Sequence, residues 1–175
     1  MKKTVDLSLH STLKIGPSVE VEIIEAPISN SSDYTIIGAS SNILFSPTPP
    51  PLAKLSKNFE YIKIEDDKLI VGAATSSGKL LSFVKKHDIA YFEFLPKLPG
   101  VLGGMIKMNA GLKEFEIFNH LHSITTSEGT FLKEEIEHGY RYTNISGIIY
   151  EASFNISRGF SQERLETFIA MRDNQ

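Results

Sequence analysis

The sequence has 175 residues, of which 41% are hydrophobic and 22% charged, so it is long enough to bury a core and too apolar to be disordered. A formal net charge of -3 gives no general attraction to nucleic acid or to an anionic membrane, and no apolar run approaches the roughly 18 residues of a membrane helix. The absence of cysteine excludes disulfides, thiolate zinc sites and a catalytic thiol, and fits a cytoplasmic protein.

The N-terminal part predicts a small α/β or mostly β unit. Val19, Val21 and Ile23 alternate with glutamates, which is typical of a half-buried strand. The proline-rich stretch that follows cannot donate hydrogen bonds to a sheet, so we expect a boundary or an exposed connection within 46–57. We therefore predict two subdomains: a first over 1–56 and a second over 57–175.

A loop of small residues lies within the first unit. Gly38-Ala39-Ser40-Ser41-Asn42 follows the strand-like run 34–37 and precedes the apolar run 43–45, which we also expect to be a strand. Small residues leave backbone amides free, and serine and asparagine side chains add donors that bind a phosphate without a net positive charge. The alternative is an ordinary turn.

The second unit begins with a hairpin and a helix. The runs 59–64 and 68–71 alternate across a short acidic turn and predict two paired strands. Ser76 or Ser77 predicts the N-cap of a helix that continues through Lys86.

A glycine-rich segment, 98–111, then interrupts an apolar stretch. Glycine permits positive φ and close backbone approach, so the segment predicts a second loop that contacts a ligand, the alternative being a tight turn. Two such loops suit a ligand with a pyrophosphate. No Gly-x-Gly-x-x-Gly follows a strand, and the segment 72–80 has five residues between its glycines, so neither a Rossmann nor a Walker A site is indicated.

The last third predicts a hairpin, a strand and a helix. The runs 120–126 and 130–132 form the hairpin, and 148–156 forms the strand. Ser161 predicts the start of a final helix. Its apolar stripe consists of Leu165, Phe168 and Ile169. No glycine or proline ends this helix, so we expect the natural chain to continue and the stripe to need a partner surface.

Four segments in this order, 11–16, 37–44, 98–111 and 139–142, resemble the motifs of the UDP-N-acetylenolpyruvoylglucosamine reductases, the MurB family. In the second segment Ala39-Ser40 replaces the glycine-rich form usual in the family. The resemblance implies an α+β fold whose two subdomains hold FAD noncovalently. It also implies an enzyme of peptidoglycan precursor synthesis in the cytoplasm, and so of cell wall biogenesis, cell shape and cell division.

The resemblance also implies the reaction. NADPH reduces the flavin, and the flavin passes a hydride to the enolpyruvyl double bond of UDP-N-acetylglucosamine enolpyruvate, which yields UDP-N-acetylmuramate. Arg141 would meet the negative charge of the resulting enolate, and Tyr140 would shape the substrate site. The cofactor residues implied are Gly38, Ala39, Ser40, Ser41, Asn42, Ile43, Pro99, Gly100, Gly103, Gly104, Asn109, Ala110 and Gly111.

In the family a third domain carries the serine that protonates the enolate and most of the UDP-sugar site. It would begin after Gln175, so we expect a fragment that consists of the two FAD-binding subdomains. A module that binds FAD or another nucleotide without catalysis is the alternative. A vanillyl-alcohol-type oxidase with a histidine-tethered flavin has less support, because the histidine nearest to either loop is His10. His120 and His122, on one face of a predicted strand, are a weak metal candidate.

Overall fold

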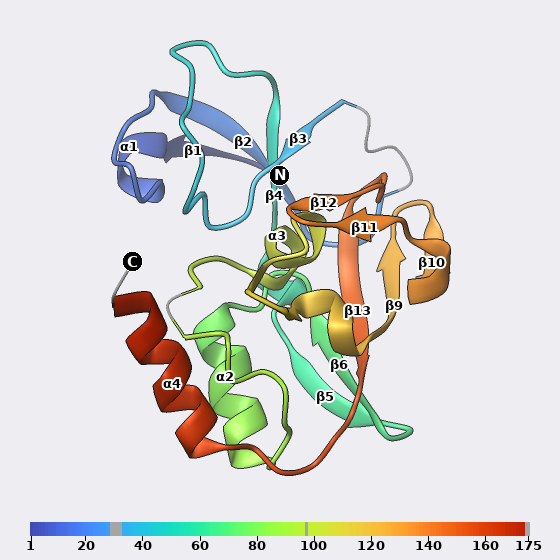
Figure 1. Ribbon diagram of the computed structural model, residues 1–175. Helices are drawn as coiled ribbons and strands as arrows, with labels where there is room; N and C mark the ends of the chain where they lie inside the picture. Colours follow the sequence, from blue (N-terminus) through green and yellow to red (C-terminus); the bar gives the residue numbers. More distant parts are fainter. Residues whose placement is uncertain (29–32, 97, 174–175) are drawn as a thin grey trace.

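The computed structural model describes residues 1–28, 33–96 and 98–173 (Figure 1). The described residues form a four-stranded sheet near the N-terminus and a five-stranded sheet below it, with helices packed mainly on the second sheet. This mixture of separate helices and sheets confirms the expected α+β fold.

The first sheet has the order β1-β2-β4-β3, in which β1 is antiparallel to β2 while β4 is parallel to both β2 and β3. Its strands are β1 (Lys2–Asp6), β2 (Ser18–Ile24), β3 (Thr35–Ile36) and β4 (Leu52–Leu55). Val21 is buried, and Val19 and Ile23 pack beside it against the short helix α1 (Leu7–His10). The predicted alternation of β2 is therefore confirmed.

One expectation for this unit was wrong, because the run 43–45 is irregular rather than a strand, and only Phe45 of its three residues is buried. The stretch 46–57, expected to be a boundary or an exposed connection, is irregular and mostly exposed over 46–51 but also contains β4, which occupies an inner position of the first sheet. The division into subdomains after residue 56 stays a prediction. The prolines end at Pro51, so Leu52–Leu55 retain the N–H groups that a ladder strand needs.

The second sheet is antiparallel throughout and has the order β10-β9-β13-β6-β5. Its strands are β5 (Ile62–Glu65), β6 (Lys68–Gly72), β9 (Leu121–Thr126), β10 (Gly129–Leu132) and β13 (Ile149–Asn155). Both predicted hairpins and the late strand are confirmed. Asp66 and Asp67 both have positive φ, 47° and 56°, as a two-residue hairpin turn of matching twist requires.

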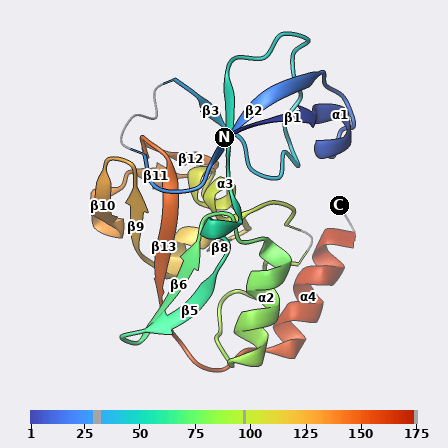
Figure 2. The ribbon, with the colours of Figure 1, turned by 180° about the vertical axis from the view of Figure 1, so that it is seen from behind.

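Helices α2 (Ser77–Lys86), α3 (Leu102–Lys107) and α4 (Gln162–Asp173) share one core with this sheet (Figures 1 and 2). Ser76 caps α2 by accepting a hydrogen bond from the Lys79 backbone, as predicted. α4 lies beside α2 in both views. Leu165 and Phe168 are buried, so most of the final apolar stripe finds its partner surface within this chain.

Shorter elements complete the second unit. They are η1 (Lys57–Phe59), β7 (Gly111–Leu112), β8 (Phe115–Glu116), η2 (Ile117–His120), η3 (Lys133–Glu135), β11 (His138–Gly139) and β12 (Tyr142–Thr143). His120 closes η2 and stacks on Tyr91, with ring centroids 4.1 Å apart, whereas His122 lies in β9. The expectation of two histidines on one strand face was therefore wrong.

The two units contact each other through a buried apolar cluster. Ile24 and Ala53 of the first sheet share a buried cluster with Phe59, Ile148 and Tyr150 of the second unit. The Tyr150 hydroxyl accepts a hydrogen bond from the Ile28 N–H at 2.9 Å and donates one to its carbonyl oxygen at 3.0 Å. This contact fixes one unit against the other. Among the described residues, no helix is long and apolar enough to cross a membrane.

Candidate functional site

The two small-residue loops meet at the boundary between the sheets. The Ser41 hydroxyl donates a hydrogen bond to the Pro99 carbonyl oxygen over 3.3 Å. A Cβ placed on Gly38 would lie 2.8 Å from a methyl carbon of Val101, and one on Gly100 would lie 3.6 Å from the Ser41 hydroxyl oxygen. The first loop (residues 38–42) and the second loop (residues 98–101) therefore form one continuous structure.

The first loop follows β3 and is hydrogen-bonded to the N-terminal segment. The Ser40 carbonyl oxygen accepts a hydrogen bond from the Thr12 N–H at 3.4 Å, and a ring nitrogen of His10 lies 3.2 Å from the Gly38 carbonyl oxygen. Ser40 has a φ of 51° and is buried, but its hydroxyl has no hydrogen-bond partner among the residues that the structure describes. An unpaired buried hydroxyl costs free energy and marks a place where a polar group of a ligand can bind.

The other residues of the first loop lie progressively nearer the surface. Ala39 and Ser41 are half-buried, while Asn42 and Ile43 are exposed. Their exposed groups and the Ser40 hydroxyl lie within the same short segment, next to the second loop.

The second predicted loop is a short turn followed by a helix. Gly100 has a φ of 128°, which favours glycine, but Gly103 and Gly104 lie in the first turn of α3. The expectation of a continuous loop over 98–111 was therefore wrong. The Gly103 N–H donates to the Ala73 carbonyl oxygen at 2.9 Å, and a Cβ on Gly103 would lie 3.2 Å from that of Ala73. The lack of a side chain at Gly103 thus allows α3 to pack closely on Ala73, which directly follows β6.

Gly104 has the opposite surroundings. A Cβ at Gly104 would meet no atom within 4 Å, apart from α3 itself and its chain neighbours. The residue is exposed, and so is Pro99 before the helix. The open side of α3 therefore offers bare backbone to a ligand that approaches from outside.

The last part of the motif supports the site from inside. Asn109 and Ala110 are buried. A Cβ on Gly111 would lie 2.2 Å from the Phe115 carbonyl oxygen, because β7 and β8 pair closely there. The close pairing of these two strands by itself requires glycine at this position.

Tyr140 and Arg141 form the turn of a small hairpin, made by β11 and β12, beside α3 (Figure 1). Tyr140 is 86% exposed, and the Arg141 guanidinium lies 5.8 Å from the centre of its ring. The Thr143 hydroxyl donates to the Lys107 carbonyl oxygen at 2.9 Å, which attaches the hairpin to α3. Tyr140 and Arg141 are therefore both exposed, on a hairpin that is attached to α3, the helix that follows the second loop.

Sequence reasoning missed Lys54. It lies in β4 opposite Ile23 and is half-buried, and burial lowers the pKa of its ammonium group below the usual value. Within the described part of the chain, no hydrogen bond or ion pair joins that ammonium group. Its charge also acts on His10, whose pKa is lowered first by burial and then by Lys54, against the hydrogen bond to Gly38. The first loop thus has an uncompensated cation nearby, and a lysine inside the apolar run 52–55 was the available signal.

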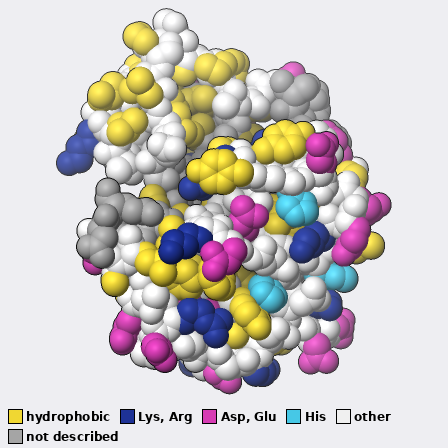
Figure 3. All heavy atoms as spheres, viewed as in Figure 1, with side chains coloured by type: hydrophobic (Ala, Val, Ile, Leu, Met, Phe, Trp, Pro, Cys, Tyr) yellow, Lys and Arg dark blue, Asp and Glu magenta, His cyan; other side chains and the backbone are white. Residues whose placement is uncertain are grey.

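Apolar side chains surround the same region. Figure 3 shows hydrophobic side chains gathered over the first unit, with most charged groups on the second. Leu9, Leu13, Ile15 and Leu44 are exposed; the first three belong to the N-terminal segment that contacts the first loop through His10 and Thr12, and Leu44 follows the loop in the chain. Such a surface can receive a flat apolar ring system next to the loop amides.

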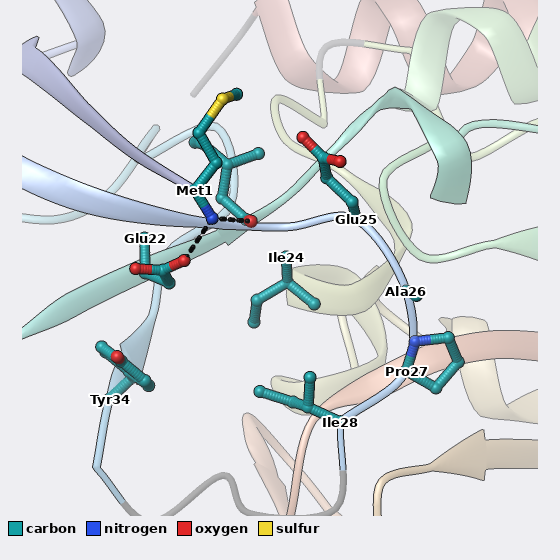
Figure 4. A pocket seen from close by; sticks show the side chains of 9 residues that line it. Met1, Glu22, Ile24, Glu25, Ala26, Pro27, Ile28 and Tyr34 are labelled. Carbon is teal, nitrogen blue, oxygen red and sulfur yellow. Dashed lines mark hydrogen bonds and ion pairs between the residues drawn. The ribbon is translucent and has the colours of Figure 1, made fainter.

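Two hollows in the surface lie away from the two loops. Figure 4 shows one of about 390 Å³ beside the end of β2, where Ile24, Pro27 and Ile28 line it and the N-terminal amine pairs with Glu22. A second, of about 440 Å³, lies between Ile28 and the outer face of the second sheet. Neither contains a residue of the two loops. Among the described residues, no group of three or more histidines and acids could hold a metal ion.

Known proteins resemble this chain over nearly its whole length. No protein-family model matches it. It is 36% identical over 172 residues to the UDP-N-acetylenolpyruvoylglucosamine reductase of Helicobacter pylori, covering 98% of this chain and 66% of that protein. It is 34% identical over 176 residues to the reductase of the same name from Campylobacter jejuni, covering 98% and 67%. The chain therefore spans about two thirds of the length of these curated relatives.

The fold comparison agrees. The crystal structure of UDP-N-acetylenolpyruvylglucosamine reductase (MurB) from Thermus caldophilus matches all of this chain and 70% of its own chain, with a TM-score of 0.86 at 24% sequence identity. That similarity identifies the arrangement of the two sheets and their helices as the one found in the Thermus protein.

Proposed function

Because this chain belongs to the UDP-N-acetylenolpyruvoylglucosamine reductase family, MurB, we propose that it is the FAD-binding part of a reductase that converts UDP-N-acetylglucosamine enolpyruvate to UDP-N-acetylmuramate. The observation that carries the proposal is the hydrogen bond between Ser41 and Pro99, which joins the two loops into one surface. NADPH would be the reductant and the cytoplasm the site of action.

The residues present fit a dinucleotide. The unpaired Ser40 hydroxyl and the open side of Gly104 lie in segments joined by that hydrogen bond. The first and second loops would hold the pyrophosphate through backbone amides and hydroxyl groups, with Lys54 as the nearby positive charge. The exposed apolar residues around the first loop would pack on the rings. Bound FAD would supply the capacity to accept a hydride from NADPH and to pass it to the substrate.

Arg141 would act on the substrate side. Addition of a hydride to an enolpyruvyl double bond leaves negative charge beside the carboxylate, and a guanidinium offers paired N–H donors to such a group. Tyr140 would orient the substrate next to it. The guanidinium lies over the Tyr140 ring, from which it can turn without breaking an ion pair, because none involves it among the described residues.

The chain spans about two thirds of its relatives, and we place the enolate-protonating serine and most of the UDP-sugar site in the remaining third. This coverage also favours the second candidate function, a module that binds FAD or another nucleotide but performs no catalysis. Anaerobic addition of NADPH to the FAD-loaded chain separates the two. Bleaching of the flavin absorbance supports the reductase, whereas saturable flavin binding without any reduction supports the module.

A further inference from the structure

Asn109 lies two residues after the end of α3, and three hydrogen bonds hold its side chain. The residue is 2% exposed and has a φ of 38°, a backbone conformation that asparagine tolerates better than most residues. Its side-chain nitrogen donates to a Glu116 carboxylate oxygen at 2.8 Å and to the Gly139 carbonyl oxygen at 3.2 Å. Its side-chain oxygen accepts from the Phe118 N–H at 3.4 Å.

These partners leave no ambiguity in the orientation of the amide. A backbone carbonyl oxygen only accepts, so Gly139 must face the nitrogen, and a backbone N–H only donates, so Phe118 must face the oxygen. Both N–H groups of the side chain are therefore used inside the protein. Asn109 has no donor left for a ligand.

The three partners belong to different elements. Glu116 ends β8, Phe118 lies in η2, and Gly139 is the last residue of β11. Gly139 directly precedes Tyr140 and Arg141, whereas Asn109 continues from the helix that carries Gly103 and Gly104. A single buried side chain thus connects the end of α3 to the turn that carries the arginine.

The hairpin of residues 138–143 depends on few such connections. Its two strands pair with each other and with neither of the large sheets. Besides Asn109, the described contacts that attach it are the Thr143 hydrogen bond to Lys107 and the stacking of His138 on Phe118, with ring centroids 4.5 Å apart. The His138 stacking and the Asn109 hydrogen bond both hold β11, the strand that enters the turn, and the Asn109 hydrogen bond is the one at Gly139, directly before Tyr140.

We propose that Asn109 is a positioning residue: its carboxamide fixes the 138–143 hairpin, and with it Arg141, relative to the cofactor side of α3, and it does not bind the cofactor. The role of the hairpin rests on the proposed function. The mechanical connection between Asn109 and the hairpin does not.

The primary test is Asn109→Asp in the chain as it exists. Aspartate keeps the size, the tolerance of positive φ and the acceptor for Phe118, but removes both donors and places a carboxylate beside Glu116. Asn119→Asp is the matched control, because it changes an exposed amide that donates to the Glu114 carbonyl oxygen at 2.7 Å in the same region. Asn109→Gly is the second variant, which keeps the backbone conformation if the aspartate prevents folding.

The first measurement is amide hydrogen exchange, which needs no ligand. We expect exchange at 138–143 to become at least about tenfold faster in Asn109→Asp than in the parent, while β6, β9 and β13 and the Asn119→Asp control stay unchanged. Unchanged protection of the hairpin, or an equal loss of protection throughout the chain, would overturn the proposal.

The second measurement separates positioning from cofactor binding. The sequence has no tryptophan, so Tyr140→Trp places the sole tryptophan at the exposed turn, where its emission can be excited selectively. FAD titration should give the same Kd within about threefold with and without Asn109→Asp, while the quenching of the tryptophan by bound flavin changes. Loss of FAD affinity with a protected hairpin would make Asn109 a ligand contact and refute the proposal. If the parent itself binds no flavin, the proposed function fails, and the exchange experiment still decides the role of Asn109.

Discussion

The Ser41 hydroxyl donates to the Pro99 carbonyl oxygen across 58 positions of sequence and across the boundary between the two sheets. The hydrogen bond is exposed, so we expect it to contribute only about 1 kcal/mol to stability. Its importance is geometric, because it makes the first and second loops one surface. The following predictions test that surface and the residues around it.

Gly104 and Gly103 should respond in opposite ways to a methyl group. Gly104→Ala adds a Cβ in open space within a helix, which should stabilise the ligand-free chain by a few tenths of a kcal/mol, up to about 1 kcal/mol. The same Cβ takes the space where bare backbone would meet FAD, so Kd should rise about tenfold. Gly103→Ala is the matched control, in which crowding against Ala73 should lower the melting temperature. Thermal melts beside FAD titrations check both; tighter FAD binding by Gly104→Ala would contradict the assignment.

Lys54→Met should raise the melting temperature of the ligand-free chain by about 1–3 °C. The substitution keeps the apolar stem and removes a half-buried charge that lacks a counter-ion among the described residues. If Lys54 provides the positive charge near the pyrophosphate, the variant should also bind FAD more weakly and with less dependence on salt concentration. Lys63→Met, on the exposed strand β5, is the control. A variant whose FAD affinity and salt dependence match the parent would remove Lys54 from the site.

The free energy of unfolding should fall as the pH drops below about 6.5. Burial, followed by the charge of Lys54, lowers the pKa of His10, and burial, followed by Lys133, lowers that of His120 against the opposing charge of Glu93. The unfolded chain therefore takes up protons near pH 6.5 that the folded chain resists, so the stabilisation present above that pH is lost as the pH falls toward the lowered pKa values. Urea titrations between pH 7.5 and about pH 5 check this.

The two histidines can be separated in that experiment. His10→Gln should flatten the pH dependence in part, and the double variant with His120→Gln should flatten it further. His122→Gln, in the strand β9 that directly follows His120, serves as the control. A pH dependence that survives unchanged in the double variant would contradict the assignment.

Arg141→Ala should lower turnover of a protein that includes the remaining third by at least about a hundredfold, with FAD affinity nearly unchanged. The guanidinium is exposed at the hairpin turn, so its loss removes charge stabilisation and little packing. Arg141→Lys should recover only a small part, because an ammonium lacks the paired donors. Oxidation of NADPH with the enolpyruvyl substrate is the assay; normal turnover by the alanine variant would exclude Arg141 from the reaction.

The sequence predicted the local elements well wherever a local signal exists. The Ser76 cap and the turn at Asp66 and Asp67 depend on residues close to each other in the chain, and the structure contains both. The helix α3 was not predicted, because glycines at its start disfavour a helix, and their cost is offset by tertiary packing: Leu102, Met105 and Ile106 are buried in the core, and Gly103 packs on Ala73. The strand β4 was not predicted either, because it directly follows a run of prolines and its position is set by pairing with β2 and β3.

The candidate site could be predicted only in outline. Small residues marked both loops, but their contact joins segments far apart in the sequence. Asn109 was predicted from the sequence to bind the cofactor, and that role remains an untested prediction. Its three internal hydrogen bonds join it to β8, β11 and η2. No periodic pattern in the sequence predicts that these elements contact Asn109. That Lys54 has no acidic partner among the described residues is likewise visible only in three dimensions.

The most direct test of the account is a titration of the purified chain with FAD, followed by flavin absorbance and fluorescence. The joined loops, the unpaired Ser40 hydroxyl and the bare backbone at Gly104 predict a saturable change with one equivalent of noncovalently bound FAD. The affinity should fall in the Gly104→Ala variant. A chain that is folded by circular dichroism but shows no saturable change up to about 100 μM FAD would contradict the account.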